Sequence, residues 1–456
     1  MDPAKGISLW SKDMPNPMTE AAVESIELEA VDDKIAELVP LFDSDYNFFR
    51  KRAKKVPISY STAAGGTTGR PSWRNTMVIQ GGAPIVTGTG DQTSLLRGTG
   101  INTAAFAQSP VGFFGVTEYT YLSEIATEGR ERGLVEISTD LIKRSLDSFL
   151  TGISAQIAGP GVGSGTLAII PTTATVSSSS GSGPTTSYIS GITNAGSFTD
   201  QQVIQVFSAE GGTNRGTATV SFTDAVAQTV WFSTALPSGT TTGDYLIISG
   251  ASGAQGAGLA NIHYFQVNSN TGTVAGLNRA TYPGRLSTPT INLGGQQITP
   301  STFQRALILM GRAMGKNVNA MKSMVWYGQP DQLYTQDAQW YERMITQNSE
   351  GGDSVKNLGR KEMSETLGGR EFQASYQADI NRVDGLVMEN WMFGELKECG
   401  LYDFGGGNTV MPVPDVGTTN GTYITDRMFA YDCFFQLCNK APRSGIYIQQ
   451  AGVLQA

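Results

Sequence analysis

The stretch GPGVGSG at residues 159–165 has glycine spacing with which backbone N–H groups could surround a phosphate. A Walker loop requires a strand, then GxxxxGK[ST], then a helix, and the dinucleotide pattern GxGxxG would require glycine where Thr166 stands. Here an apolar-periodic helix precedes the glycines, a hydrophobic run follows them, and no lysine closes the motif. We therefore predict that these glycines end the helix, by left-handed and tight-turn conformations, and bind no nucleotide.

Few residues are suited to acid–base or thiol chemistry. His263 is the only histidine in the chain, and the phrase NIHYFQV places it in a strand-like run. We expect a packed, hydrogen-bonded imidazole rather than a catalytic one. The three cysteines, Cys399, Cys433 and Cys438, support neither a disulfide framework nor a four-ligand zinc site.

The carboxylates do not define a site either. The phrase DSDYN at residues 43–47 resembles the start of a calcium loop, but Phe48 replaces the required glycine and Lys54 replaces the required glutamate. Among the 40 acidic residues, no pair stands in a setting that singles it out for glycoside hydrolysis. The sequence therefore predicts no catalytic residue, no cofactor and no metal site.

Composition indicates a folded chain without a dedicated nucleic-acid surface. Its 456 residues exceed what one core normally organises, and 39% of them are hydrophobic. A net charge of −8 argues against a protein whose main task is to bind phosphates. The first residues, MDPAKGISLWSKDMPNP, contain no apolar signal core, and no stretch is long and apolar enough to span a bilayer. We expect neither export nor membrane insertion.

The first 117 residues read as segments that cannot build a core of their own. Residues 19–41 have the spacing of one or two acidic amphipathic helices, and the basic run FFRKRAKKVP follows at residues 48–57. Residues 61–117 are rich in Gly, Thr and Ser, which predicts an extended hairpin. Such segments are buried only by lying on another subunit. The predicted intersubunit contacts are Arg50, Lys51, Arg52, Lys54, Lys55, Arg70, Arg74 and Arg97. A solvated charged surface is the alternative for them.

A long helix and a β-rich region follow. Apolar residues recur at three- and four-residue steps from Leu134 to Ile157, which predicts a long amphipathic helix. Residues 175–187 are linker-like. Beyond them, QQVIQVFSA, GTATVSFTD, QTVWFSTAL and GDYLIISG are strand candidates separated by turn residues. They predict a small antiparallel β-domain at residues 188–250.

The remaining chain has a mixed α/β pattern. TPSTFQRALILMGRAMG begins with a helix start signal and ends at Gly315, so it predicts a helix. PDQLYTQDAQWYERMIT predicts another, and SMVWYG predicts a buried strand. REFQASYQ, VDGLVMENW, FAYDCFFQLC and SGIYIQQAGV predict further strands.

The order of these parts resembles that of the major capsid proteins of tailed bacteriophages, which have the Hong Kong 97-like fold. Three phrases carry the likeness from about residue 118 onward. LIKRSLDSFLTGISAQIAGPGVGSGTLAII is similar to the family's spine helix and its glycine turn. GLNRATYP at residues 276–283 precedes a helix and then SMVWYGQPDQ, and NKAPR at residues 439–443 is similar to the turn between the family's final strands. The first 117 residues match by order and composition only.

The resemblance implies an α+β capsid fold with named parts. Residues 1–60 would be the N-terminal arm, 61–117 the E-loop and 118–165 the spine helix of the P-domain. Residues 188–250 would be an inserted antiparallel β-domain, which ordinary members lack, and 251–456 the A-domain with the rest of the P-domain. The E-loop range contains no lysine, so the covalent lysine-to-asparagine link of some members is not expected from it.

The implied function is that of a non-enzymatic shell subunit in the virion. It would form hexamers and pentamers that enclose double-stranded DNA without sequence-specific binding, and it would assemble in the host cytoplasm. The expected partners are other copies of the chain, a separate scaffolding protein, a portal protein and a decoration or cement protein. Two alternatives stand beside this reading: an encapsulin-type nanocompartment shell, and a secreted β-rich glycan-binding protein or hydrolase.

Overall fold

The computed structural model describes the following residues: 45–56, 59–60, 71–80, 102–108, 110–120, 131–159, 166–178, 187–192, 194–209, 212–224, 227–248, 259–275, 277–296, 298–315, 323–329, 366–367, 370–404, 410–412 and 426–449. The helices expected at residues 19–41 and 330–346 lie outside them. The described chain divides into two units. Unit 1 contains Gly112–Phe149 and Lys397–Cys433, and unit 2 contains the other described residues.

Unit 1 is built on strands that pack against a helix. Its elements are most of β5 (Val111–Thr120), the first part of α5 (Glu131–Ala158), the end of β20 (Trp391–Leu401), β21 (Val410–Pro412) and the first part of β22 (Asp426–Asn439). Strands β5 and β21 both pair with β22. Phe149 of α5 stacks on Tyr431 of β22 with ring centroids 5.7 Å apart. Gly115 of β5 leaves room for this ring, because a Cβ there would lie 2.7 Å from Phe149.

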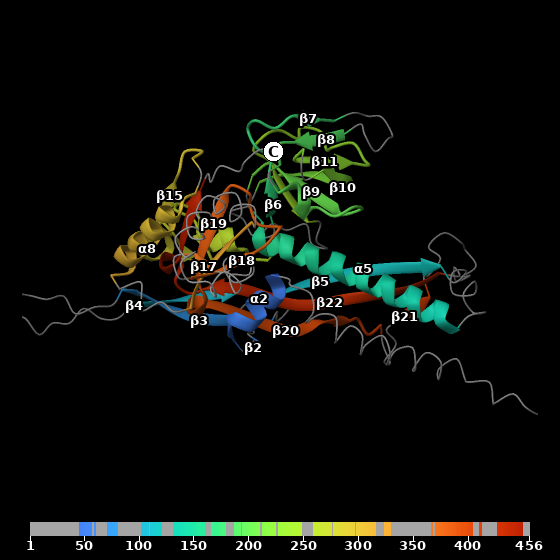
Figure 1. Cartoon of the computed structure of the whole chain (residues 1–456), viewed down its shortest axis with the longest axis horizontal. Coiled ribbons are helices and arrows are strands. Elements are labelled where there is room, and N and C mark those ends of the chain that lie inside the picture. Colours follow the sequence, from blue (N-terminus) through green and yellow to red (C-terminus); the bar gives the residue numbers. More distant parts are fainter. Residues whose placement is uncertain are drawn as a thin grey trace, which may run out of the picture. The chain divides into compact units, whose positions relative to one another are not determined.

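The predicted long helix is confirmed as α5, the teal helix of Figure 1. It begins at Glu131. Residues 118–120, which the resemblance placed in the spine-helix part at 118–165, belong to strand β5. After Ala158 the helix ends, and strand β6 (Thr166–Ile169) begins seven residues beyond Gly159. This order of helix before strand is the reverse of a phosphate-binding loop.

Gly159 has a role different from the left-handed turn that we expected. Its φ is not positive. A Cβ at this position would lie 2.5 Å from the backbone oxygen of Thr166 and 3.2 Å from that of Ala155. Glycine is therefore required because two backbone segments approach closely. Residues 160–165 lie outside the described part of the chain.

We expect Gly159→Ala to lower the free energy of unfolding by about 1–3 kcal/mol, the usual cost of forcing a methyl group into a filled site. Gly152→Ala is the matched control, because it lies inside α5 and a Cβ there would meet no atom within 4 Å. Alanine should raise stability at Gly152 by about 0.5–1 kcal/mol through helix propensity. Urea unfolding measures both. Equal stabilisation by the two substitutions would contradict the close approach at Gly159.

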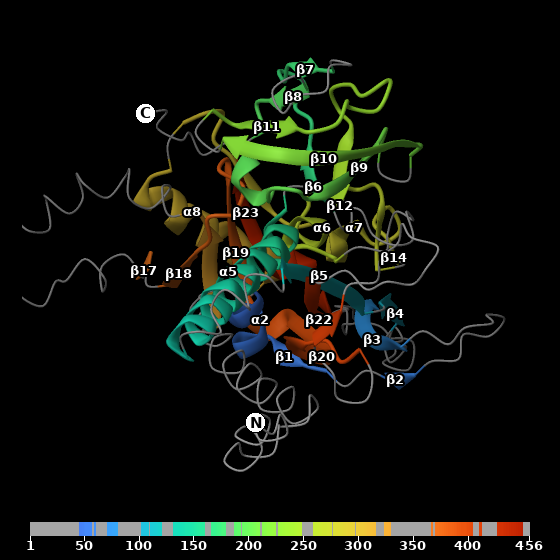
Figure 2. The ribbon, with the colours of Figure 1, turned by 90° about the vertical axis from the view of Figure 1, so that its right-hand side faces the viewer.

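Unit 2 contains a seven-stranded β-module with the strand order β6-β12-β9-β10-β11-β8-β7. The strands not yet given are β7 (Val176–Ser177), β8 (Ser187–Ser190), β9 (Val203–Phe207), β10 (Asn214–Asp224), β11 (Thr229–Phe232) and β12 (Tyr245–Ile248). All of these pairings are antiparallel. Figure 2 shows the long strand β10 between β9 and β11.

The β-module encloses its own apolar core and begins earlier in the chain than residue 188. The four strand candidates correspond to β9, β10, β11 and β12, but β6 and β7 come from residues 166–177, part of which we assigned to a linker. Strand β6 joins the sheet because Leu167 and Ala168 are buried in the core beside Leu246. Short β7 is an edge strand of the sheet, and its few residues carry too weak a pattern to be recognised.

A second sheet in unit 2 has six strands in the order β15-β23-β19-β16-β18-β17. They are β15 (Thr290–Asn292), β16 (Met324–Gly328), β17 (Thr366–Leu367), β18 (Arg370–Ala374), β19 (Arg382–Val387) and β23 (Ile446–Gln449). Helix α8 (Pro300–Met314) packs on it through Phe303, Ala306 and Met310. The predicted helix bounds are confirmed: Thr299 forms a capping box and Gly315 is left-handed with φ 63°.

The remaining elements of unit 2 are short, except for one hairpin. Helix α2 (Asp45–Arg52) leads to β1 (Lys54–Lys55), which pairs in parallel with β20. Strands β2 (Ser59–Tyr60), β3 (Pro71–Gln80) and β4 (Asn102–Gln108) form an antiparallel sheet of their own. The last elements are α6 (Ile262–Phe265), α7 (Pro283–Leu286), β13 (Thr273–Val274), β14 (Leu277–Asn278) and the 3₁₀ turns Ala195–Ser197, Met388–Asn390 and Pro442–Ser444.

The expected strand at His263 is wrong, because this residue lies in helix α6. The side chain of Asn261 accepts a hydrogen bond from the N–H of Tyr264 at 2.6 Å. This contact caps the first turn and stabilises a helix in a phrase whose aromatic residues favour strands.

Candidate functional site

The basic run at the end of α2 contains two arginines that form ion pairs and three exposed lysines. Arg50 pairs with Glu395, with 3.1 Å between Nε and Oε1. Arg52 donates a hydrogen bond from Nη1 to Oε2 of Glu371 at 2.6 Å, and its guanidinium lies 5.5 Å from the ring centroid of Phe48. These two predicted contact residues are therefore engaged within their own chain.

Lys51, Lys54 and Lys55 are exposed. Backbone pairing of β1 with β20, in the register Lys54 with Met392 and Lys55 with Phe393, holds the last two in place. None of these lysines forms an ion pair with the described residues. Of the other predicted contacts, Arg74 lies in β3 with its backbone opposite Ala107, and Arg70 and Arg97 lie outside the described residues.

Asp45 fixes the start of α2. Its carboxylate oxygen Oδ2 accepts hydrogen bonds from the hydroxyl groups of Tyr327 at 2.9 Å and Ser375 at 2.8 Å, and its backbone N–H donates to Ser154. Burial, and then the negative charge of Asp45, raise the pKa of Tyr327, which keeps this phenol a donor. The phrase DSDYN thus supplies a buried anchor rather than a calcium ligand.

No local sequence pattern indicates the partners of these α2 residues. Glu371 and Glu395 are two carboxylates among many, and each lies more than 300 positions from its arginine. Helix α2 is also held by its aromatic residues, since Tyr46 packs edge-on against Phe393 and Phe435 with ring centroids 5.7 and 5.2 Å away. An apolar pair inside a basic run, here Phe48 and Phe49, is the one local signal that the segment is buried on one side.

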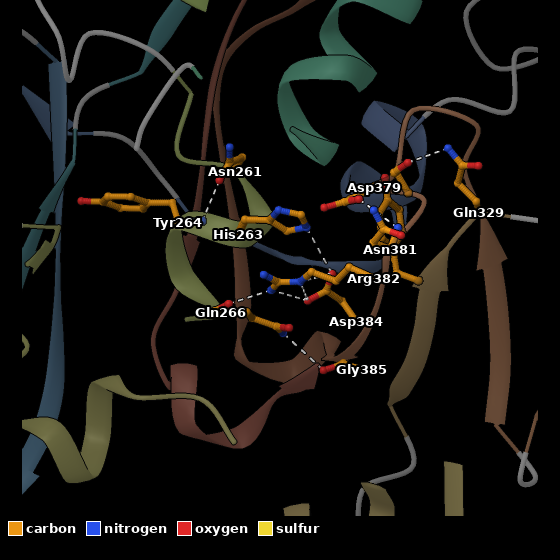
Figure 3. Close-up of polar contacts among 12 residues, drawn as sticks. Asn261, His263, Tyr264, Gln266, Gln329, Asp379, Asn381, Arg382, Asp384 and Gly385 are labelled. Carbon is orange, nitrogen blue, oxygen red and sulfur yellow. Dashed lines mark hydrogen bonds and ion pairs between the residues drawn. The ribbon is translucent and has the colours of Figure 1, made fainter. Parts of the chain in front are cut away.

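A buried polar cluster joins α6 to β19, as Figure 3 shows. His263 points toward Asp384, with 3.4 Å between Nε2 and Oδ2. Arg382 donates from Nη2 to Oδ1 of Asp384 and to the backbone oxygen of Gln266, both at 2.6 Å. Its guanidinium also lies 4.0 Å from the ring centroid of Tyr447. Because the groups are buried and mutually bonded, the cluster connects elements of the fold.

Asp384 is ionised in this cluster. Burial acts to raise the pKa of its carboxyl group, but the charge of Arg382 and then the contact with His263 lower it, so that the pKa lies below its ordinary value. A lowered pKa in the folded state stabilises the fold at every pH above the unfolded pKa of about 3.9. That stabilisation is lost as the pH falls through the folded-state value.

We therefore expect the free energy of unfolding of the native chain to fall more steeply than that of Asp384→Asn as the pH drops from about 5 to about 2. Asparagine keeps the shape of the side chain and does not titrate. Urea midpoints at several pH values measure the two slopes. Equal slopes would mean that the carboxylate contributes nothing to acid sensitivity.

Two arginines in the phrases that carry the family resemblance donate hydrogen bonds to backbone carbonyl oxygens. Buried Arg279, in GLNRATYP, donates to the backbone oxygen of Tyr264 at 2.5 Å. Arg443, in NKAPR, donates from Nε to the backbone oxygen of Ala313 near the end of α8 and from Nη1 to that of Gly284. The contact with Ala313 places the positive charge of Arg443 on a carbonyl in the last turn of α8, where the helix dipole favours it.

Metal and thiol chemistry have no visible centre in the described part of the chain. No group of three or more His, Cys, Asp or Glu side chains there could hold a metal ion. Cys399, Cys433 and Cys438 are buried and unbridged, and burial raises the pKa of Cys438. No described helix is long and apolar enough to cross a membrane.

No protein-family model matches the sequence, and a search of curated proteins returned no match. Among solved structures, the chain is similar to the "Cyanophage A-1(L) capsid asymmetric unit" at 11% identity and a TM-score of 0.49, over 90% of this chain and 94% of that one. A structure from Gordonia phage Cozz aligns at 10% identity and a TM-score of 0.39, over 88% and 85%. The capsid of a native GTA particle aligns at 9% identity and a TM-score of 0.39, over 88% and 89%.

Proposed function

We propose that the chain is a major capsid protein of a tailed bacteriophage, the structural subunit of an icosahedral shell that encloses double-stranded DNA. One observation carries the proposal: the described elements follow the order that the sequence resemblance implies. A bonded basic segment, an extended hairpin and a long helix precede the α/β region. The phrases that carry the resemblance supply α5, Arg279 and Arg443, all of which hold the fold together.

The parts of the chain take the roles that the resemblance implies. Residues 1–60 are the N-terminal arm, 61–117 the E-loop and 118–165 the spine-helix region of the P-domain. Residues 188–250 supply most of the inserted β-domain, whose sheet also includes β6 and β7, and 251–456 supply the A-domain and the remaining P-domain. The sheet β2-β3-β4 supports the E-loop assignment, because it pairs with no other described sheet. A hairpin of this kind is stabilised when it lies on another subunit.

The inserted β-domain is the part best suited to an additional partner. Phe222, Trp231 and Tyr188 stand opposite one another on β10, β11 and β8, and the ring centroids are 5.4 and 4.8 Å apart. Their neighbours Val230 and Ile189 point into the core, so this aromatic row lies on the outer side of the sheet. A decoration or cement protein could bind there, since aromatic residues are enriched at interfaces.

The remaining functional assignments follow if the chain is a shell subunit. The chain forms hexamers and pentamers, and its partners include a separate scaffolding protein and a portal protein. It catalyses no reaction, assembles in the host cytoplasm and resides in the virion. A net charge of −8 suits a shell subunit that encloses anionic DNA without binding it tightly.

Sedimentation velocity and negative-stain microscopy of the purified full chain, alone and coexpressed with a scaffolding protein, test the proposal. Closed shells, or hexameric and pentameric rings, are expected. A monomer under all of these conditions, particularly one that cleaves or binds glycans, would contradict it.

A further inference from the structure

One face of strand β5 in unit 1 leaves large apolar side chains in solvent. Phe114 is 59% exposed and Val116 is 60% exposed, whereas Phe113, which precedes them on the opposite side of the strand, is buried. The ring of Phe114 lies 6.1 Å from that of Tyr402, which in turn lies 5.1 Å from Phe404. We call Phe114, Val116, Tyr402 and Phe404 the β5 face. Tyr402 and Phe404 are partly exposed. Contiguous apolar residues that reach solvent mark interaction surfaces.

Carboxylates accompany the β5 face. Glu118 is exposed on the same side of β5 as Val116, because alternate residues of a strand share a side. Asp403 is exposed between Tyr402 and Phe404, and Glu398 is exposed on β20. Lys397, whose Nζ lies 5.8 Å from the ring centroid of Tyr402, is paired with Asp432 at 2.6 Å between Nζ and Oδ1. An apolar centre with a charged rim is the usual anatomy of a protein interface.

We propose that the β5 face of one copy binds the basic α2–β1 segment of a second copy. Lys51, Lys54 and Lys55 are exposed within five positions of one another and form no ion pair with the described residues. Arg50 and Arg52 are by contrast compensated by Glu395 and Glu371. The lysines thus carry a compact positive charge that complements the rim of Glu118, Glu398 and Asp403.

This inference rests on the proposed shell function and names one of the contacts that function requires. Charge complementarity of this kind steers the encounter of two copies and fixes their register, and the apolar face supplies the burial. Contacts that are weak singly add up when they repeat around a closed symmetric assembly.

Charge reversal on the full chain tests the contact. The rim variant carries Glu118→Lys and Asp403→Lys, the lysine variant carries Lys51→Glu and Lys54→Glu, and a combined variant carries all four. We expect each of the first two to lower the assembled fraction at a fixed concentration about tenfold or more, through like-charge repulsion. The combined variant should recover assembly, because opposite charges then face each other again.

Mixing the rim variant with the lysine variant identifies the second copy. Each contact between unlike chains pairs opposite charges, so the mixture should assemble where either variant alone does not. Recovery in the combined variant but not in the mixture would place the contact within one chain and overturn the proposal. Failure of the rim variant together with normal assembly of the lysine variant would also overturn it, because another segment would then cover the β5 face.

A matched control separates this contact from a general effect of charge. Asp200→Lys with Glu389→Lys makes the same change in net charge as the rim variant, but at two exposed positions of unit 2. This control variant should assemble like the native chain. Urea midpoints equal to that of the native chain verify that each variant is folded. Normal assembly of both reversal variants would refute the contact and leave the shell function standing, whereas failure of the native chain to assemble would refute the shell function itself.

Discussion

Replacing Arg382 by methionine should lower the free energy of unfolding by about 3–5 kcal/mol, since it leaves a buried carboxylate without its compensating charge. The guanidinium makes contacts of 2.6 and 3.0 Å with the two oxygens of Asp384 and also satisfies the backbone oxygen of Gln266. Methionine keeps much of the length and apolar volume of arginine. The loss therefore reports on charge and hydrogen bonding more than on packing. Urea unfolding at neutral pH measures it.

The double variant Arg382→Met, Asp384→Asn provides the control for the first prediction. Removing the carboxylate charge as well should make the double variant more stable than Arg382→Met alone, although less stable than the native chain. His263 keeps a polar neighbour in the asparagine side chain. A double variant no more stable than the single one would contradict the view that the uncompensated charge is the main cost.

Asp45→Ala is the second large effect, with an expected loss of about 2–4 kcal/mol. The substitution leaves the buried hydroxyl groups of Tyr327 and Ser375 without the acceptor that both of them share. It also removes the fixed start of helix α2. The measurement is again the midpoint and slope of urea unfolding, followed by the fluorescence of the buried tryptophans.

Two further variants separate the causes of that loss. Asp45→Asn keeps one oxygen acceptor and should cost clearly less than alanine. Adding Tyr327→Phe and Ser375→Ala to Asp45→Ala removes the orphaned hydroxyls and should cost little more than Asp45→Ala alone. A triple variant whose loss equals the sum of the three single losses would show that the groups do not act together.

Local sequence was sufficient for the elements whose pattern is long or whose ends carry capping residues. The apolar stripe that ends at Ile157 predicted α5, and Thr299 with Gly315 predicted both ends of α8. A buried run such as Met324–Gly328 predicted a strand because its β-branched and aromatic residues favour one. Edge strand β7 was missed because its two residues are too few to show a period. Helix α6 was missed because the Asn261 cap overrides the β-propensity of the residues around His263.

The sequence by itself determined the class of protein to expect: a chain without a catalytic or metal-binding set, with apolar-poor N-terminal segments and ordered phrases that resemble those of phage capsid proteins. Tertiary structure decided which charged residues are used inside the chain. Arg50 and Arg52 meet Glu395 and Glu371, while Lys51, Lys54 and Lys55 remain at the surface. Neighbouring residues of one basic run thus differ in whether they form an ion pair with the described residues. Pairing depends on which distant carboxylate the fold brings near, and no local pattern encodes that distance.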